Sequence, residues 1–552
     1  MKKNTLPRKC FALCLASIML LMNGCGSSDT GSNSKNSSDS ESGRNTNTAA
    51  EYSDESGKIT DEAVELTIWK IWQNDYVDLN NLPAVKALEE VTGVKINYIT
   101  VSWAEASEKF ALMLTSGDYP DIIDSAAGSY PGGGETAISD GVYLELTDYI
   151  EKYMPNYKAY REGNEEVRKA TMTDSGQIFA VYMLRATTDG TLAGEPAWAG
   201  LSIRKDWLDQ LDKAMPETID EWHDVLTAFK NEFNAEAPLM INPEGEMVTN
   251  SFLSAYGVKS GTGMYLDGNT VKYGPLEEGY RQYVELMRQW YAEGLIDQNF
   301  LSNDAGLIPA NFAASDRTGA GGNLSGWVND YYYKMGMTDN EDFWLSAVQA
   351  PVLNKGETAQ SRMADSIVGS ASAITTACKY PEIAAQWMDF MYSEEGLLYN
   401  NYGILGETYD IDADGSYYYT DTILNSPENL SSSDYLYQYV RGDGVGLCAW
   451  DRFELLSDES DDEVVENPKE IWNSDGTALD IPGAVTMSET EGSEFSLLFS
   501  DIKSYVQEKT VSYIIGTDSM DTYDKFVEDI KGMNIAKCIE IQQAAYERYL
   551  ER

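Results

Sequence analysis

The sequence predicts an α/β protein built from two lobes. The first third of the chain alternates strand-like and helix-like segments, which is the pattern of a parallel sheet covered by helices. Past about residue 156 this pattern gives way to new strands and long amphipathic helices. About 490 residues lie beyond a polar N-terminal segment, more than one hydrophobic core usually supports. We therefore expect two lobes, each with its own core.

The first 24 residues have the pattern of a bacterial lipoprotein signal. Four basic residues, Lys2, Lys3, Arg8 and Lys9, precede an apolar stretch at 11–22 that is too short to span a bilayer. Small residues follow, and then Cys25; Met22 stands where such signals usually have Leu. We expect Cys25 to be lipidated, which would hold the protein at the outer face of the cell membrane. The alternative is an ordinary secretory signal or membrane anchor that happens to contain a cysteine.

Residues 25–62 are expected to be the lipidated cysteine and a flexible linker. Residues 26–56 are almost all Ser, Gly, Asn, Asp and Thr, so they offer little apolar surface to offset the entropy of ordering. The ordered protein is expected to begin near Ala63.

The first lobe should open with a βαβαβ arrangement. Strands are expected at 66–71, 94–101 and 121–124, separated by helices that end at Gly93 and Gly117. Pro83 fits the first position of one helix, and Ser102 with Glu105 has the spacing of a capping box for the other. In such a sheet, ligands bind beyond the carboxyl ends of the strands.

Further strands are expected at 176–183, 201–204 and 370–377. Helices are expected at 205–211, from a capping box of Thr218 and Glu221, at 280–293, from Pro381 to Gly396, at 495–508 and at 521–550. The tryptophans at 207, 222, 290 and 387 lie on apolar helical stripes and are expected in the core.

Composition excludes several classes of function. A net charge of −50 disfavours nucleic acid and anionic lipid as partners. Beyond Cys25, three widely spaced cysteines remain, at 378, 448 and 538, which suits neither a disulfide framework nor a cysteine-rich metal site. The single histidine, His223, lies on a predicted helix surface, so histidine-based catalytic triads and zinc-hydrolase sites lack the residues they need.

Several short blocks occur in order along most of the chain. They are LMLTSGDYPDII at 112–123, LTDYI at 146–150, MPN at 154–156, IRKDWL at 203–208, YAEGLID at 291–297, AAQWM at 384–388, SEEG at 393–396, NYGI at 401–404 and QQAAYERY at 542–549. Together they resemble the extracellular solute-binding lipoproteins of bacterial ABC importers, of the carbohydrate-associated, LplA-like kind.

This resemblance implies a type II periplasmic-binding-protein fold, with a hinge between two lobes and the ligand in the cleft. The chain would cross between lobes more than once, with lobe 1 at 63–184 plus 306–369 and lobe 2 at 185–305 plus 370–552. The implied function is capture of a carbohydrate, a neutral oligosaccharide, by lobe closure and its delivery to ABC permease subunits. The protein would be a monomer without enzymatic activity, cofactor or nucleic-acid partner.

The expected ligand residues combine aromatic faces for sugar C–H groups with polar groups for hydroxyls. Five tryptophans lie in loops or at element ends and either line the cleft or pack structurally: Trp72, Trp103, Trp198, Trp327 and Trp450. Asn74, Asp75 and Asp124 follow predicted strands and are expected to contact hydroxyls; their alternative role is to cap helices or turns.

One segment imitates a calcium-binding loop. Asp410, Asp412 and Asp414 precede a glycine, and Asp421 occupies the twelfth position, where such loops place a bidentate Glu. A β-hairpin with an Asp-Gly turn explains the segment better, because residues 417–420 read as a strand.

Other functions stay open at this point. A secreted carbohydrate-active hydrolase needs only two suitably spaced carboxylates. The same fold could instead serve an adhesin or a sensor-linked receptor, or import a peptide or a sugar acid. The acidic composition weighs against sugar acids unless Arg185, Arg204 or Arg317 offsets it locally.

Overall fold

The structure is a computed structural model, and the part of it described here begins at Lys58. Described residues are 58–72, 77–242, 246–303, 308–314, 317–329, 331–334, 336–360, 366–425, 432–442, 444–456, 467–473 and 480–552. The expected signal, Cys25 and the linker up to residue 57 lie outside this part of the chain. Within it, no helix combines the length and apolar character needed to cross a membrane.

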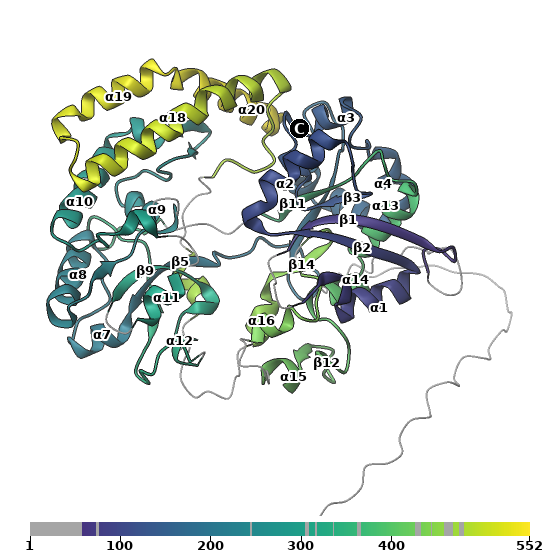
Figure 1. Ribbon diagram of the computed structural model, residues 1–552, viewed down its shortest axis with the longest axis horizontal. Coiled ribbons are helices and arrows are strands. Elements are labelled where there is room, and N and C mark those ends of the chain that lie inside the picture. Colours follow the sequence, from purple (N-terminus) through teal and green to yellow (C-terminus); the bar gives the residue numbers. More distant parts are fainter. Residues whose placement is uncertain are drawn as a thin grey trace, which may run out of the picture. The chain divides into compact units, whose positions relative to one another are not determined.

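A six-stranded sheet forms the centre of what we call the first body (Figure 1). Its strand order is β14-β4-β11-β3-β1-β2, and β1 pairs in parallel with both β2 and β3, as the βαβαβ pattern predicted. β4 and β14 are parallel to each other, whereas β11 runs antiparallel to its neighbours. The strands are β1 (Val64–Ile71), β2 (Val94–Val101), β3 (Ile122–Asp124), β4 (Val181–Ala186), β11 (Val368–Ile374) and β14 (Leu447–Ala449).

The helices that cover this sheet come from two separate parts of the chain, α1–α6 and α13–α16. α1 begins at Pro83 and ends before Gly93, which has the left-handed φ of 73° that favours glycine at a helix end. The helices of the first body are α1 (Pro83–Thr92), α2 (Trp103–Ser116), α3 (Gly133–Ser139), α4 (Thr147–Tyr153), α5 (Pro155–Gly163), α6 (Glu165–Ala170), α13 (Pro381–Phe390), α14 (Glu394–Asn401), α15 (Asp421–Leu424) and α16 (Ser432–Leu436). A hairpin of β12 (Tyr409–Ile411) and β13 (Tyr417–Tyr419) joins α14 to α15.

A four-stranded sheet forms the centre of the second body, with strand order β10-β5-β9-β6. β5 is antiparallel to both β10 and β9, and β6 is parallel to β9. The strands are β5 (Ala199–Arg204), β6 (Ala237–Leu239), β9 (Thr318–Leu324) and β10 (Leu345–Ala347), with a separate hairpin of β7 (Met264–Asp267) and β8 (Thr270–Tyr273).

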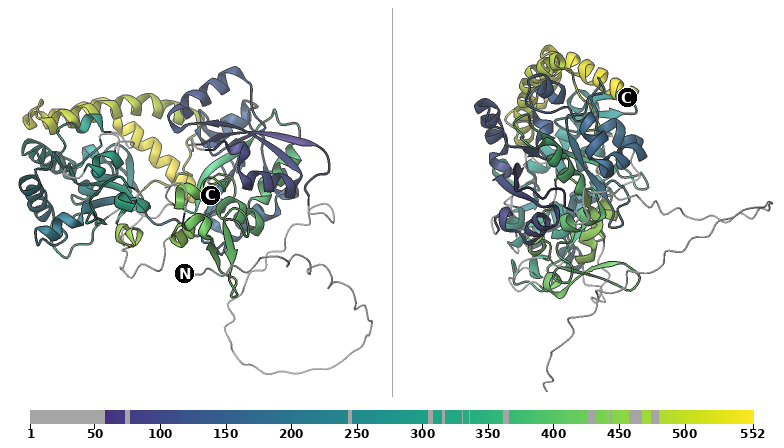
Figure 2. Two further views of the ribbon diagram at one scale, coloured as in Figure 1. Left: turned by 60° about the horizontal axis from the view of Figure 1, so that its bottom comes forward. Right: turned by 90° about the vertical axis from the view of Figure 1, so that its right-hand side faces the viewer.

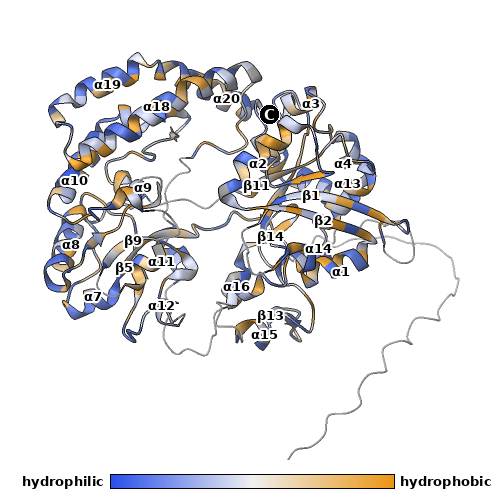
Figure 3. Ribbon diagram, viewed as in Figure 1, coloured by the Kyte–Doolittle hydropathy of each residue, from blue (hydrophilic) through white to orange (hydrophobic). Residues whose placement is uncertain are grey.

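Long helices pack around the second sheet; α18 lies beside α10, and α19 and α20 pack against α18 (Figures 1 and 2). Their sides carry both polar and apolar residues, as amphipathic helices require (Figure 3). The helices are α7 (Lys205–Gln210), α8 (Ile219–Phe233), α9 (Glu246–Ser254), α10 (Glu278–Ala292), α11 (Ile308–Ala313), α12 (Tyr331–Lys334), α17 (Pro468–Trp472), α18 (Glu489–Ile515), α19 (Tyr523–Gly532) and α20 (Ile535–Glu551).

The chain passes between the two sheets after β4, after β10 and after β14, so both bodies are discontinuous, as expected. The expected boundaries are wrong beyond residue 305. β9 and β10 pair with β5 in the second sheet, whereas residues 306–369 were expected in lobe 1. β11 and β14 pair with strands of the first sheet, whereas all of 370–552 was expected in lobe 2.

Three local expectations also differ from the structure. Ser102 precedes α2 but makes no cap bond to the helix backbone; its hydroxyl contacts the Glu105 carboxylate instead. The helix from Pro381 ends at Phe390, and Gly396 lies inside α14. The expected helix at 521–550 is broken by Asn534, whose φ of 68° starts a new helix. In contrast, Thr218 and Glu221 form the expected capping box of α8.

Each body has its own core, and the four tryptophans expected in helical cores are buried there. Trp387 belongs to the first core, and Trp207, Trp222 and Trp290 belong to the second. Trp472, which the sequence did not single out, is also buried: α17 presses it against Gly200 of β5, and its Nε1 donates to the backbone oxygen of Leu201 over 2.7 Å.

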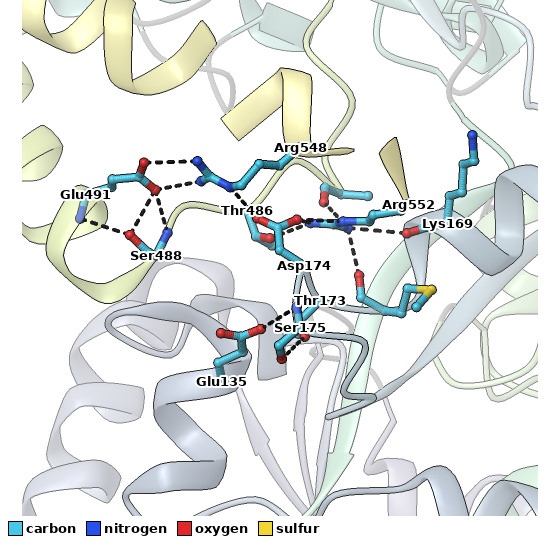
Figure 4. Close-up of polar contacts among 12 residues, drawn as sticks. Glu135, Lys169, Thr173, Asp174, Ser175, Thr486, Ser488, Glu491, Arg548 and Arg552 are labelled. Carbon is cyan, nitrogen blue, oxygen red and sulfur yellow. Dashed lines mark hydrogen bonds and ion pairs between the residues drawn. The ribbon is translucent and has the colours of Figure 1, made fainter. Parts of the chain in front are cut away.

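The end of α20 bonds to the first body (Figure 4). Arg552 donates to the Asp174 carboxylate and to the backbone oxygens of Met172 and Lys169. Arg548 donates to Asp174 and, through two nitrogens, to Glu491 at the start of α18. A polar connection therefore joins the α18–α20 helices to the segment that leads into β4.

Candidate functional site

Three of the expected ligand tryptophans lie at one edge of the first sheet, which we call the carboxyl edge. Trp72 follows β1, Trp103 follows β2, and Trp450 follows β14. These strands are spread over the full width of the six-stranded sheet. At about 4.8 Å between neighbouring strands, the edge spans roughly 24 Å. Aromatic side chains are thus distributed along an edge as long as several sugar units.

The other two tryptophans lie at one edge of the second sheet. Trp198 comes directly before β5, and Trp327 follows the end of β9. β5 begins opposite the end of β9, and the backbone oxygen of Trp198 accepts a bond from Ser325 N over 2.8 Å. Trp327 stacks on Tyr331 with a centroid separation of 6.2 Å. Both side chains therefore belong to the edge at which β5 enters the second sheet.

The chain connects these two edges directly. Residues 187–198 run from the end of β4 to the start of β5. The connection from β10 to β11 joins the same two edges, because β10 runs toward the start of β5 and Val368 of β11 pairs with Leu184 near the end of β4. The connection from β14 to α17 leaves the first sheet at this edge, because Ala449 pairs with Ala186. Trp198 and Trp450 thus lie in these connections or at their ends, and Trp72 and Trp327 lie at the same two edges. Trp103 follows β2, the edge strand farthest from β14.

The five tryptophans differ in exposure. Trp103 is 67% exposed and Trp198 is 37% exposed, whereas Trp72, Trp327 and Trp450 are half-buried. Nε1 of Trp72 donates to the backbone oxygen of Val77 over 3.3 Å, which fixes its ring. The edges therefore offer both fixed and accessible aromatic surface.

The Asp124 carboxylate differs from the expectation that it contacts ligand hydroxyls. It is fully buried and accepts hydrogen bonds from Lys70, Arg441, Ser372 and the backbone N–H of Val445. Burial disfavours its ionisation, but Lys70 and Arg441 outweigh this effect and hold the pKa of Asp124 well below its usual range. In this structure the carboxylate has no surface that a ligand could reach.

Asn74 and Asp75, the other two expected hydroxyl partners, lie outside the described residues. They directly follow Trp72 in the sequence, so their assignment stays a prediction.

The end of β14 carries polar residues that sequence reasoning missed. Glu195 lies between Arg185, at 3.6 Å, and Lys469, at 3.9 Å, and the Lys469 ammonium lies over the Trp450 ring. Thr188 donates to one oxygen of Asp451. Nε1 of Trp450 and the other Asp451 oxygen are buried, and among the described residues no hydrogen-bond partner lies within reach. Charged residues are so frequent in this chain that no sequence signal distinguished these.

A cavity of about 330 Å³ lies elsewhere, between the end of α9 and the connection that follows β10. Ser254, Gly257, Val352, Glu357 and Gln360 line it. None of the expected ligand residues contributes to it, so we base the candidate site on the two sheet edges.

The calcium-like segment folds as the β12–β13 hairpin, which the sequence favoured over a calcium loop. Gly415 has a φ of 92°, and the carboxylate of Asp414 accepts bonds from Ser416 within the turn. In the part of the chain that the structure describes, no group of three or more acidic, histidine or cysteine side chains could hold a metal ion. Asp410, Asp412, Asp414 and Asp421 are therefore not brought together as a calcium site.

Comparison with known proteins decides the family. The family model described as bacterial extracellular solute-binding protein matches residues 81–397, more than half of the chain. The chain belongs to this family. Its members are solute-binding proteins of transport systems and not enzymes, so the hydrolase alternative is set aside.

Relatives of this solute-binding protein extend over most of its length. It is 24% identical over 491 residues to FusA, a fructooligosaccharide ABC transporter substrate-binding protein of Streptococcus pneumoniae, covering 86% of this chain and 88% of FusA. It is 21% identical over 493 residues to YtcQ, a polygalacturonan/rhamnogalacturonan-binding protein of Bacillus subtilis, covering 84% and 88% of the two chains.

Solved structures support the same fold. The alginate-binding protein AlgQ2 matches with a TM-score of 0.71 at 23% identity, covering 90% of this chain and all of AlgQ2. FusA of S. pneumoniae in complex with kestose matches with a TM-score of 0.68 at 20% identity, covering 88% of this chain and 99% of FusA. The two-bodied α/β architecture is therefore that of solute-binding proteins.

Proposed function

We propose that this protein captures an oligosaccharide outside the cytoplasm and delivers it to the permease of an ABC importer. The observation that carries the proposal is the placement of five tryptophans at two sheet edges joined by the connections between the bodies. Aromatic faces pack against the C–H patches of sugar rings. The names of FusA and YtcQ, both oligosaccharide- or polysaccharide-binding, support the same ligand class.

Trp450 offers a sugar the half-buried face of its ring. Its Nε1 and the Asp451 Oδ1 are buried, as the Asp124 carboxylate is, so neither atom is assigned a ligand contact.

We favour a neutral oligosaccharide over a sugar acid. A uronate is recognised best by an arginine or lysine whose donors face the ligand. The three arginines that the sequence left open for this role are all paired with carboxylates: Arg185 with Glu195, Arg204 with Asp206, and Arg317 with Glu236 and Asp297. At the carboxyl edge, Lys70 and Arg441 are paired with Asp124. These cations are already neutralised before any ligand arrives.

Capture would proceed by hinge motion. A ligand that contacts both edges favours the arrangement in which the edges approach, because only that arrangement allows both sets of contacts. The closed form would then dock on a pair of permease subunits, and ATP would be hydrolysed by a separate cytoplasmic subunit.

Lipidation of Cys25 would keep the protein close to its permease. The basic, apolar and small residues before Cys25 have the order that such processing requires. Replacing Cys25 with Ser should release the protein from membranes into the medium, and a C25S protein that still fractionates with membranes would contradict the lipid anchor.

A ligand screen tests the main proposal. Calorimetry and thermal unfolding would compare neutral fructo-, gluco- and galacto-oligosaccharides with oligogalacturonates, alginate oligomers and peptides. A bound ligand raises the melting temperature by mass action. We expect binding of one neutral class, with the sugar recovered intact. Binding of oligogalacturonates or peptides alone would contradict the neutral-sugar assignment.

Matched variants test the site. W72A and W450A should weaken binding at least tenfold. Y380A is the control, because Tyr380 is 40% exposed and follows β11 at the opposite edge of the first sheet. Equal affinity for all three variants and the unchanged protein would show that the ligand binds elsewhere.

A further inference from the structure

We propose that Asp124 is a positioning residue of the ligand site: its buried carboxylate fastens the segment before β14 to the sheet and thereby holds Trp72 and Trp450 in place. This inference rests on the proposed function, because it concerns the same carboxyl edge. It replaces direct ligand contact, which burial of the carboxylate does not allow in this structure.

Asp124 joins three strands to one loop. Its Oδ2 accepts from Lys70 of β1 over 3.0 Å and from Arg441 over 2.7 Å. Its Oδ1 accepts from Ser372 of β11 over 2.7 Å and from Val445 N over 2.9 Å. Asp124 itself ends β3. Ser125 Oγ also donates to Oδ1, over 3.3 Å. Two of these five partners, Arg441 and Val445, belong to the segment that leads into β14 and Trp450.

The Arg441 guanidinium forms hydrogen bonds to several parts of the first body. Besides Asp124, it donates to the Tyr98 hydroxyl over 3.0 Å, to Asn400 and to the backbone oxygen of Val445. Its side chain is fully buried. Among the described residues, Asp124 is the carboxylate that pairs with the Arg441 guanidinium.

The same segment lies close to Trp72. A Cβ built on Gly442 would lie 3.8 Å from the Trp72 ring, and one built on Gly444 would lie 2.5 Å from Lys70 Nζ. The segment therefore packs between the buried charges on one side and a predicted ligand tryptophan on the other. A shift of this segment should change the surroundings of Trp72. It should also move the start of β14, which leads to Trp450.

Loss of the Asp124 charge should displace the segment. In D124N the Arg441 cation would stay buried without the Asp124 carboxylate, and Lys70 would lose one anionic partner, which favours rearrangement toward water. Arg441, Gly442, Gly444 and Val445 lie outside the strands of the sheet and are therefore the part of the network that can move. We expect affinity for the oligosaccharide to fall at least tenfold.

Asp206 provides a matched control. It forms a two-pronged pair with Arg204 at 2.7 and 2.6 Å, and both side chains are almost fully buried. Arg204 ends β5, at the opposite end of that strand from Trp198. D206N should therefore destabilise the protein as D124N does but leave ligand affinity within twofold. S372A is a milder variant, since it removes one hydrogen bond to Asp124 and keeps its charge, and it should weaken binding two- to fivefold.

Fluorine NMR on protein labelled with 5-fluorotryptophan reads the position of the rings without any ligand. W72F and W450F assign the two resonances. We expect D124N, and to a smaller extent S372A, to shift or broaden both resonances, and D206N to leave them unchanged. Calorimetry on the same variants, below their melting temperatures, measures ligand affinity.

The outcomes separate this inference from the proposed function. Unchanged Trp72 and Trp450 resonances in D124N and S372A would overturn the positioning role, whatever the ligand. Shifted resonances with unchanged affinity would overturn it as well and would place the ligand away from the carboxyl edge. If D124N and S372A shift both resonances and weaken binding while D206N does neither, the result would support the positioning role and the proposed function.

Discussion

The Asp174 carboxylate lies 2.8 Å from Nε of Arg552, the residue that follows α20 (Figure 4). Arg552 is almost fully buried, and Asp174 lies in the segment that leads into β4. α20 itself belongs to the second body, since Gln543 bonds to Val271 and Asn269 beside the β7–β8 hairpin. This pair is therefore a direct bond between the two bodies, separate from the chain connections.

The pair should contribute measurably to stability. D174N removes the acceptor charge shared by Arg548 and Arg552, and a double-mutant cycle of Asp174 with Arg552 should give a coupling of about 1 kcal/mol in urea unfolding. The exposed Lys152–Asp148 pair on α4 is the control, with an expected coupling below about 0.5 kcal/mol. Equal couplings for the two pairs would show that the Asp174 contact is an ordinary surface pair.

Alanine should destabilise the protein at Thr218 but not at Ser102, although both residues have the capping-box spacing. Thr218 accepts a bond from the backbone N–H of Glu221, so T218A should cost about 1 kcal/mol of unfolding free energy. Ser102 makes no such bond, so S102A should stay within about 0.5 kcal/mol. Chemical denaturation of both variants measures this, and a cost for S102A as large as for T218A would show that Ser102 caps α2 in solution.

The sequence predicted local elements well because their signals are local. Pro83 and Gly93 bracket α1, and the β-branched run at 94–101 forms β2 as expected. The assignment of later strands to a lobe failed because pairing is not local. β9 and β11 are mostly buried, and nothing within either segment indicates which sheet it joins.

The site was predictable only in part. A tryptophan that follows a strand end is visible in the sequence, so Trp72 and Trp103 could be placed at the carboxyl edge. The environment of Asp124 could not be foreseen, since Arg441 lies more than 300 residues away and meets it only through the position of β14. Because Asp124 is buried beside Lys70 and Arg441, its carboxylate has a structural role where the sequence predicted a ligand contact.

Glycine at position 444 should be indispensable. Its φ is 141°, and an added Cβ would lie 2.6 Å from Asp124 Oδ2 as well as against Lys70. G444A should therefore cost about 3 kcal/mol or more, because backbone strain and a clash with buried charges act together. G415A is the control: its φ is 92° but no atom lies within 4 Å of the added Cβ, so about 1–2 kcal/mol is expected. Equal losses of unfolding free energy for G444A and G415A in urea would mean that the backbone at Gly444 shifts to accommodate a side chain.

The contribution of Asp124 to stability should vanish in acid. Its pKa is lowered in the folded state, so its stabilisation is complete above the unfolded pKa of about 4 and is lost as the pH falls toward the folded pKa. The difference in unfolding free energy between the unchanged protein and D124N should therefore be constant from pH 7 to pH 5. Below pH 4 it should shrink by about 1 kcal/mol per pH unit. Urea unfolding of both proteins at pH 7, 5, 4 and 3 measures the difference, and the titrations of all other groups cancel between them to first order. The opposite trend, a difference that grows as the pH falls, would mean that Asp124 is protonated in the folded protein and that Lys70 and Arg441 do not hold it ionised.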